Sequence, residues 1–460
     1  MKELSAFFLL LSGGLMSIAT AQTTPNILII LADDAGYADF GFMGSKEIQT
    51  PQIDKLAAMG TVFTDAHVAA TVSSPSRAMM MTGRYGQRFG YECNTTNIGG
   101  LPESEETIAE LLKKYDYRTA CIGKWHLGTL DSQHPNQKGF DNFYGMIGGS
   151  RNYFYNANKD DREGRQTQYQ HNGKGIPFDG YFTDELTRRG KEFIAAGTTP
   201  FLLDLSYTAP HSPNQATDED MKRFEGNPRQ KLAAMMWALD RGVGEIVEQL
   251  KKTNQFDNTI IFFLSDNGGS TMNNSSNLPL KGFKGNKFEG GQRVPFFVVW
   301  GDKFKSQENF TGLSSALDIF ATVVDAVNIP KKKLNKKLDG VSLLPYLYGK
   351  KKGNPHKTLY WRKMDTRAIR DKDYKLILTR NVDTVLYNIA EQIDEHDNLL
   401  FSEPKKAKQL IKKLAKWEKN ECIEPIWIEN GWGPTTNGYH QKLMNNEIKT
   451  ADDLRKKKKK

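Results

Sequence analysis

The stretch Asn26-Ile27-Leu28-Ile29-Ile30-Leu31-Ala32-Asp33-Asp34 joins an almost continuous apolar run to a pair of carboxylates. Such a run is typical of a strand that is buried on both faces of a parallel sheet. Similar runs occupy residues 119–122, 201–206, 259–265 and 294–300. Helical patterns separate them, at residues 53–59, 107–115, 181–196 and 229–252. The chain is therefore predicted to be an α/β protein whose large, mostly parallel mixed sheet is flanked by helices.

The pattern changes beyond Tyr348, which indicates a second domain. Short strand-like segments at residues 359–362, 367–369, 375–379 and 385–387 precede one amphipathic helical pattern at residues 404–419. We expect a larger domain at residues 22–350, a Lys/Gly-rich link, and a smaller α+β domain at residues 354–440. Residues 441–460 are predicted to form a basic tail. Its last six residues supply six positive charges, so the formal net charge of +9 is weak evidence for an acidic partner.

The first 21 residues have the character of a secretory signal peptide. A charged start is followed by an apolar run at residues 7–18 and by Ala19-Thr20-Ala21 before Gln22. The protein is therefore expected to be exported, to the periplasm or outside the cell, with no stable membrane insertion and no nucleic-acid partner. The cysteines are odd in number and widely spaced, which predicts unpaired thiols rather than a disulfide framework: Cys93, Cys121 and Cys422.

A second motif reads Ser73-Ser74-Pro75-Ser76-Arg77. Pro75 suits the first turn of a helix, and Ser74 suits the capping position just before it. Ser73 is then expected at the mouth of the helix, where free N–H groups and the helix dipole favour an anion, with Arg77 one turn further on. From this motif alone, an ordinary capped helix with a buried methionine face is an equally good interpretation.

Polar side chains follow two of the predicted strands. Asp33-Asp34 comes directly after the first strand, and Asp266-Asn267 follows residues 259–265. The carboxyl ends of parallel strands meet at one edge of a sheet, where such folds bind their ligands. Three carboxylates and one amide suit Ca²⁺ or Mg²⁺ better than zinc. Either pair alone is explained equally well by a turn, but both pairs after buried strands favour a metal site.

Three further segments offer positive or proton-transferring groups. Lys124 and His126 lie at i and i+2, so an extended segment would point both to the same side. His211 lies in a loop stiffened by two prolines, and Lys284 precedes a glycine-rich turn before the last strand. Taken singly, each has an ordinary structural explanation as a packed histidine, a solvated lysine or a turn.

In order and spacing, these segments resemble the type I, formylglycine-dependent sulfatase family over nearly the whole mature chain. The matching positions are residues 26–34, 50–57, 73–84, 123–128, 209–211, 265–269, 284–295, 386–388, 394 and 398–399. With a serine at position 73, the chain is most similar to the serine-type bacterial polysaccharide sulfatases. The resemblance implies an alkaline phosphatase-like fold and the activity of a sulfuric ester hydrolase.

The resemblance also implies a cofactor and a role for each site residue. A separate serine-type maturase would oxidise Ser73 to formylglycine (3-oxoalanine), and one Ca²⁺ would be bound by residue 73 together with Asp33, Asp34, Asp266 and Asn267. The hydrated aldehyde and the sulfate would be held by Arg77 and Lys124. The base on the spare hydroxyl would be His126, and the groups that hold the sulfate and help the alcohol to leave would be His211 and Lys284.

The substrate is indicated only indirectly. Residues 151–172 are rich in groups that stack on and hydrogen-bond sugars, or that equally form a mobile surface loop: Tyr153, Tyr155, Arg162, Arg165 and His171. With the predicted export, this favours a sulfated carbohydrate, such as the algal polymers ulvan or carrageenan. Two alternatives stand beside this interpretation. One is a phosphodiesterase or phosphonate hydrolase of the same superfamily, whose additional Asp and His ligands are not found here; the other is an unmodified, inactive carbohydrate-binding homologue.

Overall fold

The structure is a computed structural model that describes residues 24–95, 99–156, 169–301, 303, 309–428 and 432–457. The predicted signal peptide lies outside the described residues, as do Arg162 and Arg165. Within the described part, no helix is both long and apolar enough to cross a membrane. Cys93, Cys121 and Cys422 form no disulfide with one another, as the sequence predicted.

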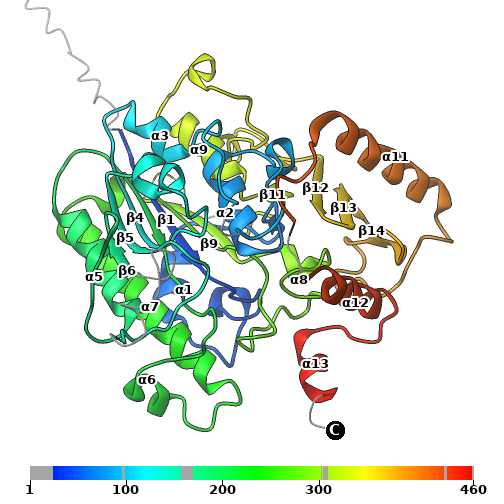
Figure 1. Cartoon of the computed structure of the whole chain (residues 1–460), viewed down its shortest axis with the longest axis horizontal. Coiled ribbons are helices and arrows are strands. Elements are labelled where there is room, and N and C mark those ends of the chain that lie inside the picture. The colour runs from blue at the N-terminus through cyan, green and yellow to red at the C-terminus, as the bar shows by residue number, and fades with distance from the viewer. Residues whose placement is uncertain are drawn as a thin grey trace, which may run out of the picture.

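A nine-stranded sheet forms the centre of the larger domain, in the order β2-β10-β9-β1-β8-β4-β5-β6-β7 (Figure 1). Its middle five strands run parallel: β9 (Thr259–Ser265), β1 (Asn26–Ala32), β8 (Phe201–Ser206), β4 (Arg118–Lys124) and β5 (Asn142–Met146). The edges are antiparallel: β10 (Phe296–Trp300), β2 (Thr61–Val62), β6 (Tyr169–His171) and β7 (Lys174–Gly175). The predicted mostly parallel mixed sheet is confirmed at its centre.

Helices cover both faces of this sheet because alternate residues of each strand point to opposite sides. On one face, Leu28 and Ile30 of β1 pack with α1 (Pro51–Ala57), α5 (Phe182–Ala195) and α7 (Gln230–Lys252). On the other face, Ile27 and Ile29 pack with α2 (Ser73–Thr82), α3 (Ile108–Lys113), α9 (Asp318–Ala326) and α10 (Leu344–Leu347). The sheet is therefore the middle layer of three.

Shorter elements complete the larger domain. A two-stranded parallel sheet joins β3 (Ala66–His67) to β11 (Ser314–Ser315), and α6 (Asp218–Arg223) and α8 (Glu289–Gln292) are short helices. The described residues also form short 3₁₀ helices: η1 (Gly41–Met43), η2 (Gly86–Phe89), η3 (Asp131–Gln133), η4 (Pro135–Gln137), η5 (Phe256–Asn258) and η6 (Lys331–Lys333).

The smaller domain is an antiparallel meander that lies beside the larger one (Figure 1). Its strands are β12 (Thr358–Lys363), β13 (Thr366–Asp371), β14 (Tyr374–Thr379) and β15 (Asp383–Asn388). One face packs on α11 (Pro404–Glu421), and the other packs on the end of α12 (Trp432–Met444) and the segment leading into α13 (Ala451–Lys457).

The end of the chain corrects one prediction. Leu443, Ile448 and Ala451 are buried in the core of the smaller domain rather than exposed in a basic tail. Residues 441–457 therefore belong to that domain. A few apolar side chains lie between the lysines of this segment, and they pack against β12 to β15.

Candidate active site

The acidic residues meet at the carboxyl ends of β1 and β9. Because Ala32 pairs with Ser265 across the two strands, Asp33-Asp34 and Asp266-Asn267 leave the sheet side by side. All four residues are buried. The amide of Asn267 donates to Asp34 Oδ1 at 2.7 Å, and the Asp34 N–H donates to Asp266 Oδ1 at 3.2 Å. These contacts show that the predicted oxygen-rich cluster is present.

Ser73 lies against this cluster from the first turn of α2. Its Oγ is 3.3 Å from Asp33 Oδ1 and 3.2 Å from Asn267 Oδ1. The predicted cap was wrong, because α2 already begins at Ser73 and its capping position is Val72. The Ser74 N–H instead donates to Asn94 Oδ1 at 3.2 Å. This shift directs the Ser73 side chain towards the carboxylates.

Each buried carboxylate has a cation beside it. Lys124 Nζ donates to Asp33 Oδ2 at 2.6 Å, and Arg77 Nε donates to Asp266 Oδ2 at 3.1 Å. A guanidinium nitrogen of Arg77 also donates to the carbonyl of Lys124 at 3.0 Å, which joins the two cations into one unit. The third pair, between Lys284 Nζ and Asp34 Oδ2, measures 2.8 Å. The formal charges of the centre are therefore close to balance.

The carboxylates nevertheless differ in proton affinity. Burial raises the pKa of Asp33, and the nearby Asp266 raises it further, so the pKa stays above its ordinary value despite Lys124. Burial also acts to raise the pKa of Asp34 and of Asp266, but the nearby positive charges, led by Lys284 and Arg77 respectively, together outweigh it and hold both pKa values below the usual range. The mutual repulsion of these carboxylates is what a divalent cation relieves, and an all-oxygen donor set fits Ca²⁺ or Mg²⁺.

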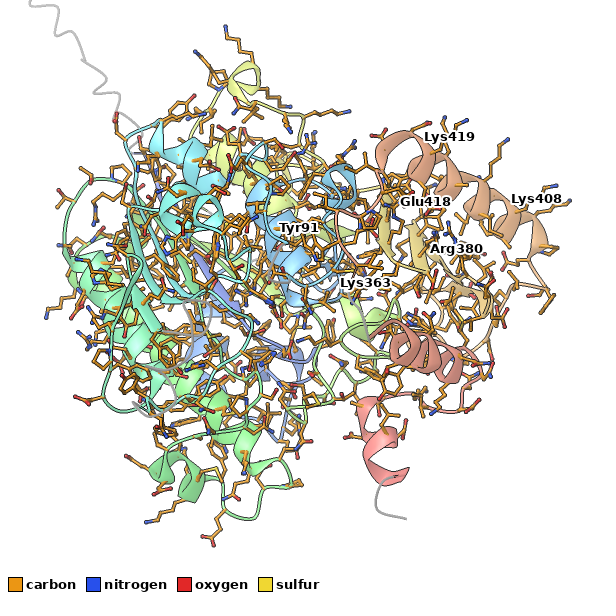
Figure 2. All side chains as sticks on the ribbon, in the orientation of Figure 1. Tyr91, Lys363, Arg380, Lys408, Glu418 and Lys419 are labelled. Atoms are coloured by element: carbon orange, nitrogen blue, oxygen red, sulfur yellow. The ribbon has the colours of Figure 1, made fainter. Side chains whose placement is uncertain are left out.

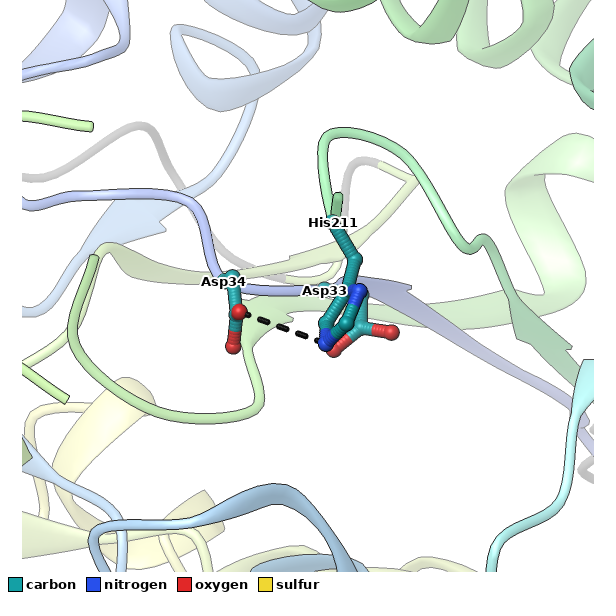
Figure 3. A group of neighbouring side chains, drawn as sticks. All are labelled: Asp33, Asp34 and His211. Atoms are coloured by element: carbon teal, nitrogen blue, oxygen red, sulfur yellow. Dashed lines mark ion pairs between the residues drawn. The ribbon is translucent and has the colours of Figure 1, made fainter. Parts of the chain in front are cut away.

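The two predicted histidines occupy different positions around the centre. His211 Nδ1 donates to the Ser212 carbonyl at 2.6 Å, and its Nε2 lies 3.5 Å from Asp34 Oδ2 (Figure 3). His126 has a positive φ of 60°, and its Nδ1 has no hydrogen-bond partner within the described residues. A Cβ at Gly149 would lie 2.6 Å from the His126 ring, so a side chain there would displace the ring.

His126 is suited to accept a proton. Burial lowers its pKa, and the positive charges of Lys124 and Arg77 lower it further, well below 6.5. The ring is therefore neutral near pH 7, and its Nδ1 is buried without a hydrogen-bond partner among the described residues. This combination is typical of a general base rather than of a structural histidine.

A cavity of about 320 Å³ opens onto the centre, with Asp34, His211 and Lys284 in its wall. None of the described residues within 151–172 lines it. The predicted sugar-stacking role of Tyr153 was wrong, because this side chain is buried and donates to the carbonyls of Thr208 and His211. Tyr155 packs on Tyr169 and Phe178, and His171 lies in β6.

Residues that the sequence did not single out form the rest of the wall. They are Val72, Asn94, Ser212, Ser270, Met272, Phe283, Gly285, Asn286, Lys363, Thr436 and Tyr439. The last three come from the smaller domain. No short motif marks them, because only the packing of the two domains brings them to the cavity.

A metal-compatible cluster of buried carboxylates, a hydroxyl at a helix start, three cations and a neutral histidine define a hydrolase of anionic esters. The sulfatase family model matches residues 25–329, and the chain belongs to the sulfatase family. It is thus a sulfuric ester hydrolase with the alkaline phosphatase-like fold, as the sequence predicted.

Named relatives agree with this assignment. The chain is 35% identical over 397 residues to the uncharacterized sulfatase YdeN of Escherichia coli (strain K12), covering 73% of this chain and 68% of that protein. It is 32% identical to human N-acetylgalactosamine-6-sulfatase, with 72% and 67% covered. Among solved structures, Ps i-CgsB in complex with k-i-k-neocarrahexaose is 36% identical with a TM-score of 0.83, covering 92% of this chain and all of that one.

Proposed function

We propose that this sulfatase removes sulfate from a sulfated carbohydrate, with Ser73 oxidised to formylglycine and one Ca²⁺ at the acidic centre. The observation that carries this proposal is the contact of Ser73 Oγ with both Asp33 and Asn267. It puts the side chain of residue 73 among the oxygen ligands, where an oxidised side chain would share the metal with Asp34 and Asp266.

Bound Ca²⁺ supplies Lewis acidity that stabilises charge on the sulfuryl oxygens. An aldehyde hydrate at residue 73 supplies two oxygens, one to accept the sulfuryl group and one whose deprotonation releases sulfate, whereas a serine hydroxyl has only one. This difference explains why oxidation of Ser73 is part of the proposal. An unmodified serine would leave the reaction arrested after sulfuryl transfer.

The protein's own residues hold charge and move protons. Arg77, Lys124 and Lys284 provide fixed positive charge in a buried site, which is usually the largest contribution to catalysis. His126, held neutral, accepts a proton from the side chain of residue 73. His211, whose Nε2 faces the centre, donates a proton to the departing alcohol.

The carbohydrate substrate is supported by the structural relative that was solved with k-i-k-neocarrahexaose. Of the algal polymers that we considered, this favours a carrageenan-type oligosaccharide over ulvan. The predicted signal peptide supports export to the periplasm or beyond, where such polymers would be met.

Phosphate-ester hydrolysis is less well supported. The donor atoms of the second acidic cluster, Asp65, His67 and Glu289, are close enough to hold a metal ion, but the side chains of Arg293, Arg370 and Lys375 already pair with its carboxylates. The likeness to the phosphonate monoester hydrolase of Agrobacterium radiobacter, at 18% identity and a TM-score of 0.63, extends to the fold alone.

The proposal is tested by expressing the protein with and without a serine-type maturase. Peptide mass spectrometry across residue 73 should show the loss of two hydrogens only with the maturase, together with hydrolysis of sulfated oligosaccharides. Activity without that mass change contradicts the formylglycine mechanism. A preference for phosphate esters over sulfate esters contradicts the substrate assignment.

A further inference from the structure

The smaller domain carries a strongly basic helix on its surface. Within its 18 residues, α11 has seven lysines and two glutamates. Outside α11 and the last six residues, the chain has slightly more acidic than basic side chains. The positive charge that the chain carries before its last six residues is therefore concentrated on this helix.

Most of these lysines form one stripe along α11. They follow one another at intervals of three or four residues: Lys405, Lys408, Lys412, Lys416 and Lys419. At 3.6 residues per turn, this spacing puts them within an arc of about 80° and over a length of about 21 Å. All of their side chains are exposed, and none is hydrogen-bonded or ion-paired to another described residue. Figure 2 shows Lys408 and Lys419 towards the two ends of α11, at the outer edge of the smaller domain.

The opposite face of α11 fixes the direction of this lysine stripe. Ala407, Leu410, Leu414 and Trp417 are buried in the core that the helix forms with the strands of the smaller domain. Trp417 stacks on Tyr360 of β12, with 4.7 Å between the ring centroids. Since these positions lie on the other side of the helix from the lysine stripe, the stripe faces solvent.

The two glutamates of α11 do not neutralise the lysine stripe. Glu418 pairs with Arg367 of β13 at 2.6 Å, and Glu421 pairs with Arg88 of η2. Both carboxylates therefore turn towards the body of the protein. The ammonium groups of the stripe are left to interact with water or with a partner from solution.

We propose that the lysine stripe is a second binding site, for a linear sulfated polysaccharide that is the polymeric form of the substrate. The choice of a sulfated polymer rests on the proposed function, which supplies the class of ligand. A row of positive charges about 21 Å long fits a partner whose negative charges repeat along a chain. Each exposed ionic contact is weak, but several contacts made by one chain add up because they share the cost of association.

The lysine stripe is separate from the active-site cavity. α11 packs on one face of the β12–β15 sheet and α12 packs on the other. Of these two helices, only α12 contributes residues to the cavity wall. A polymer that is held on α11 thus leaves the cavity free and raises the concentration of sulfate esters around it.

Other polyanions fit the lysine stripe less well. A helix that binds to a lipid surface inserts an apolar face between the lipids, but the apolar face of α11 is buried in the protein. Proteins that bind single-stranded nucleic acid add aromatic side chains on which bases stack. The aromatic residue of α11 is Trp417, which is buried.

The test uses the triple variant Lys408→Gln/Lys412→Gln/Lys416→Gln, which removes the middle of the stripe and keeps good helix formers there. The probes are carrageenan polymer and the same polymer after chemical desulfation. Binding is measured in Ser73→Ala protein, so that no sulfate is removed during the experiment. We expect the triple variant to bind the sulfated polymer about tenfold more weakly at low salt, because three ionic contacts are lost. The difference should shrink at high salt, where exposed charges are screened.

The matched control is Lys331→Gln/Lys332→Gln/Lys333→Gln, which removes the same charge from exposed positions in η6 of the larger domain. An equal loss in this control overturns the inference, because it indicates an effect of net charge. Equally tight binding to desulfated polymer, to duplex DNA or to vesicles of phosphatidylglycerol and phosphatidylcholine also overturns it. If thermal unfolding shows that the triple variant melts early, Lys408→Gln/Lys416→Gln gives the same comparison.

Turnover by the matured protein separates this inference from the proposed function. The triple variant should have a raised KM for the polymer and an unchanged kcat/KM for a sulfated disaccharide, which is too short to reach both sites. Hydrolysis of sulfated oligosaccharides without binding that depends on the stripe overturns the inference and leaves the proposed function intact. Binding that depends on the stripe, in a protein that hydrolyses no sulfated carbohydrate, supports the inference and contradicts the proposed function.

Discussion

Among the described residues, two groups of buried carboxylates lie close enough together to hold a metal ion, and one of them has the features of a reaction centre. In the second acidic cluster, which lies between the two domains, the carboxylate of Glu289 contacts three side chains. The distances are 3.0 Å to His67, 2.7 Å to Lys375 and 3.3 Å to Arg293. Despite burial, the nearby positive charges, led by Lys375, hold the pKa of Glu289 well below its usual range. The ion pairs that Glu289 makes with Lys375 and Arg370 therefore join the two domains.

The active centre has similar pairs but differs in access. A cavity reaches Asp34 and Lys284, Ser73 Oγ lies among the carboxylate oxygens, and His126 keeps a ring nitrogen without a partner in the described structure. Charge density is therefore a poor guide to function in this protein. A cavity that reaches the carboxylates marks the site that can perform chemistry.

The largest effect is expected from Ser73→Ala, which removes the group that becomes the nucleophile. Sulfatase activity should fall by at least about a thousandfold, because the remaining charges stabilise a reaction that has no acceptor for the sulfuryl group. Steady-state kinetics with a sulfated oligosaccharide measure the loss, and thermal unfolding should show an intact fold. A variant that retains substantial activity would show that residue 73 is not the nucleophile.

Glu289→Gln addresses the other cluster and should affect stability rather than chemistry. Removing this carboxylate leaves Lys375 and Arg293 buried with too little negative charge, which typically costs about 3–5 kcal/mol. Chemical denaturation measures the change, with the exposed Glu391→Gln as control. Activity per folded molecule should change far less than in Ser73→Ala. A fall in activity with no loss of stability would contradict the distinction between the two clusters.

His126→Gln tests the available proton acceptor, with an expected loss of about a hundredfold in kcat. Because burial and nearby cations keep the pKa of His126 well below 6.5, the wild-type base stays neutral at mildly acidic pH, and its activity should persist there. The pH profile of kcat checks this. The control is His171→Gln in β6, outside the cavity, which should leave kcat almost unchanged.

The sequence predicted most accurately what depends on local pattern. The bounds of β1, β8 and β9 agree with their apolar runs, because strands buried on both faces must be apolar almost throughout. The helix predicted at residues 53–59 begins earlier, at Pro51, since proline suits a first helical turn. The acidic centre followed from the rule that strand ends share one edge of a sheet.

Features that depend on tertiary packing were not predictable in this way. Tyrosine is a residue type that often stacks on sugars, which is why Tyr153 was a candidate for sugar binding. In the structure Tyr153 is buried, and its hydroxyl donates to the His211 carbonyl and so fixes the loop that carries this histidine. Lys363 and Tyr439 belong to segments with no motif, and they reach the cavity only because the smaller domain docks beside α8 and α2. Local patterns thus locate the acidic centre, whereas the wall of the cavity beside it depends on how the two domains pack.

The smallest effect is expected at His440, which holds α12 to the segment between the two clusters. Burial, with Lys287 and Lys363 nearby, lowers its pKa from 6.5 to about 3. The unfolded chain therefore binds a proton first as the pH falls, so the contribution of His440 to stability is complete above pH 6.5 and is lost towards pH 3. By pH 5 the loss should be about 2 kcal/mol.

The physical reason lies in the tautomer, because His440 Nε2 accepts the Lys287 N–H and protonation removes that acceptor. Denaturation midpoints from pH 7 to pH 5 should fall more steeply for the wild type than for His440→Gln, which cannot titrate. Equal slopes in the two proteins would place the acid sensitivity elsewhere. A shallower slope in the wild type than in His440→Gln would contradict the lowered pKa of His440.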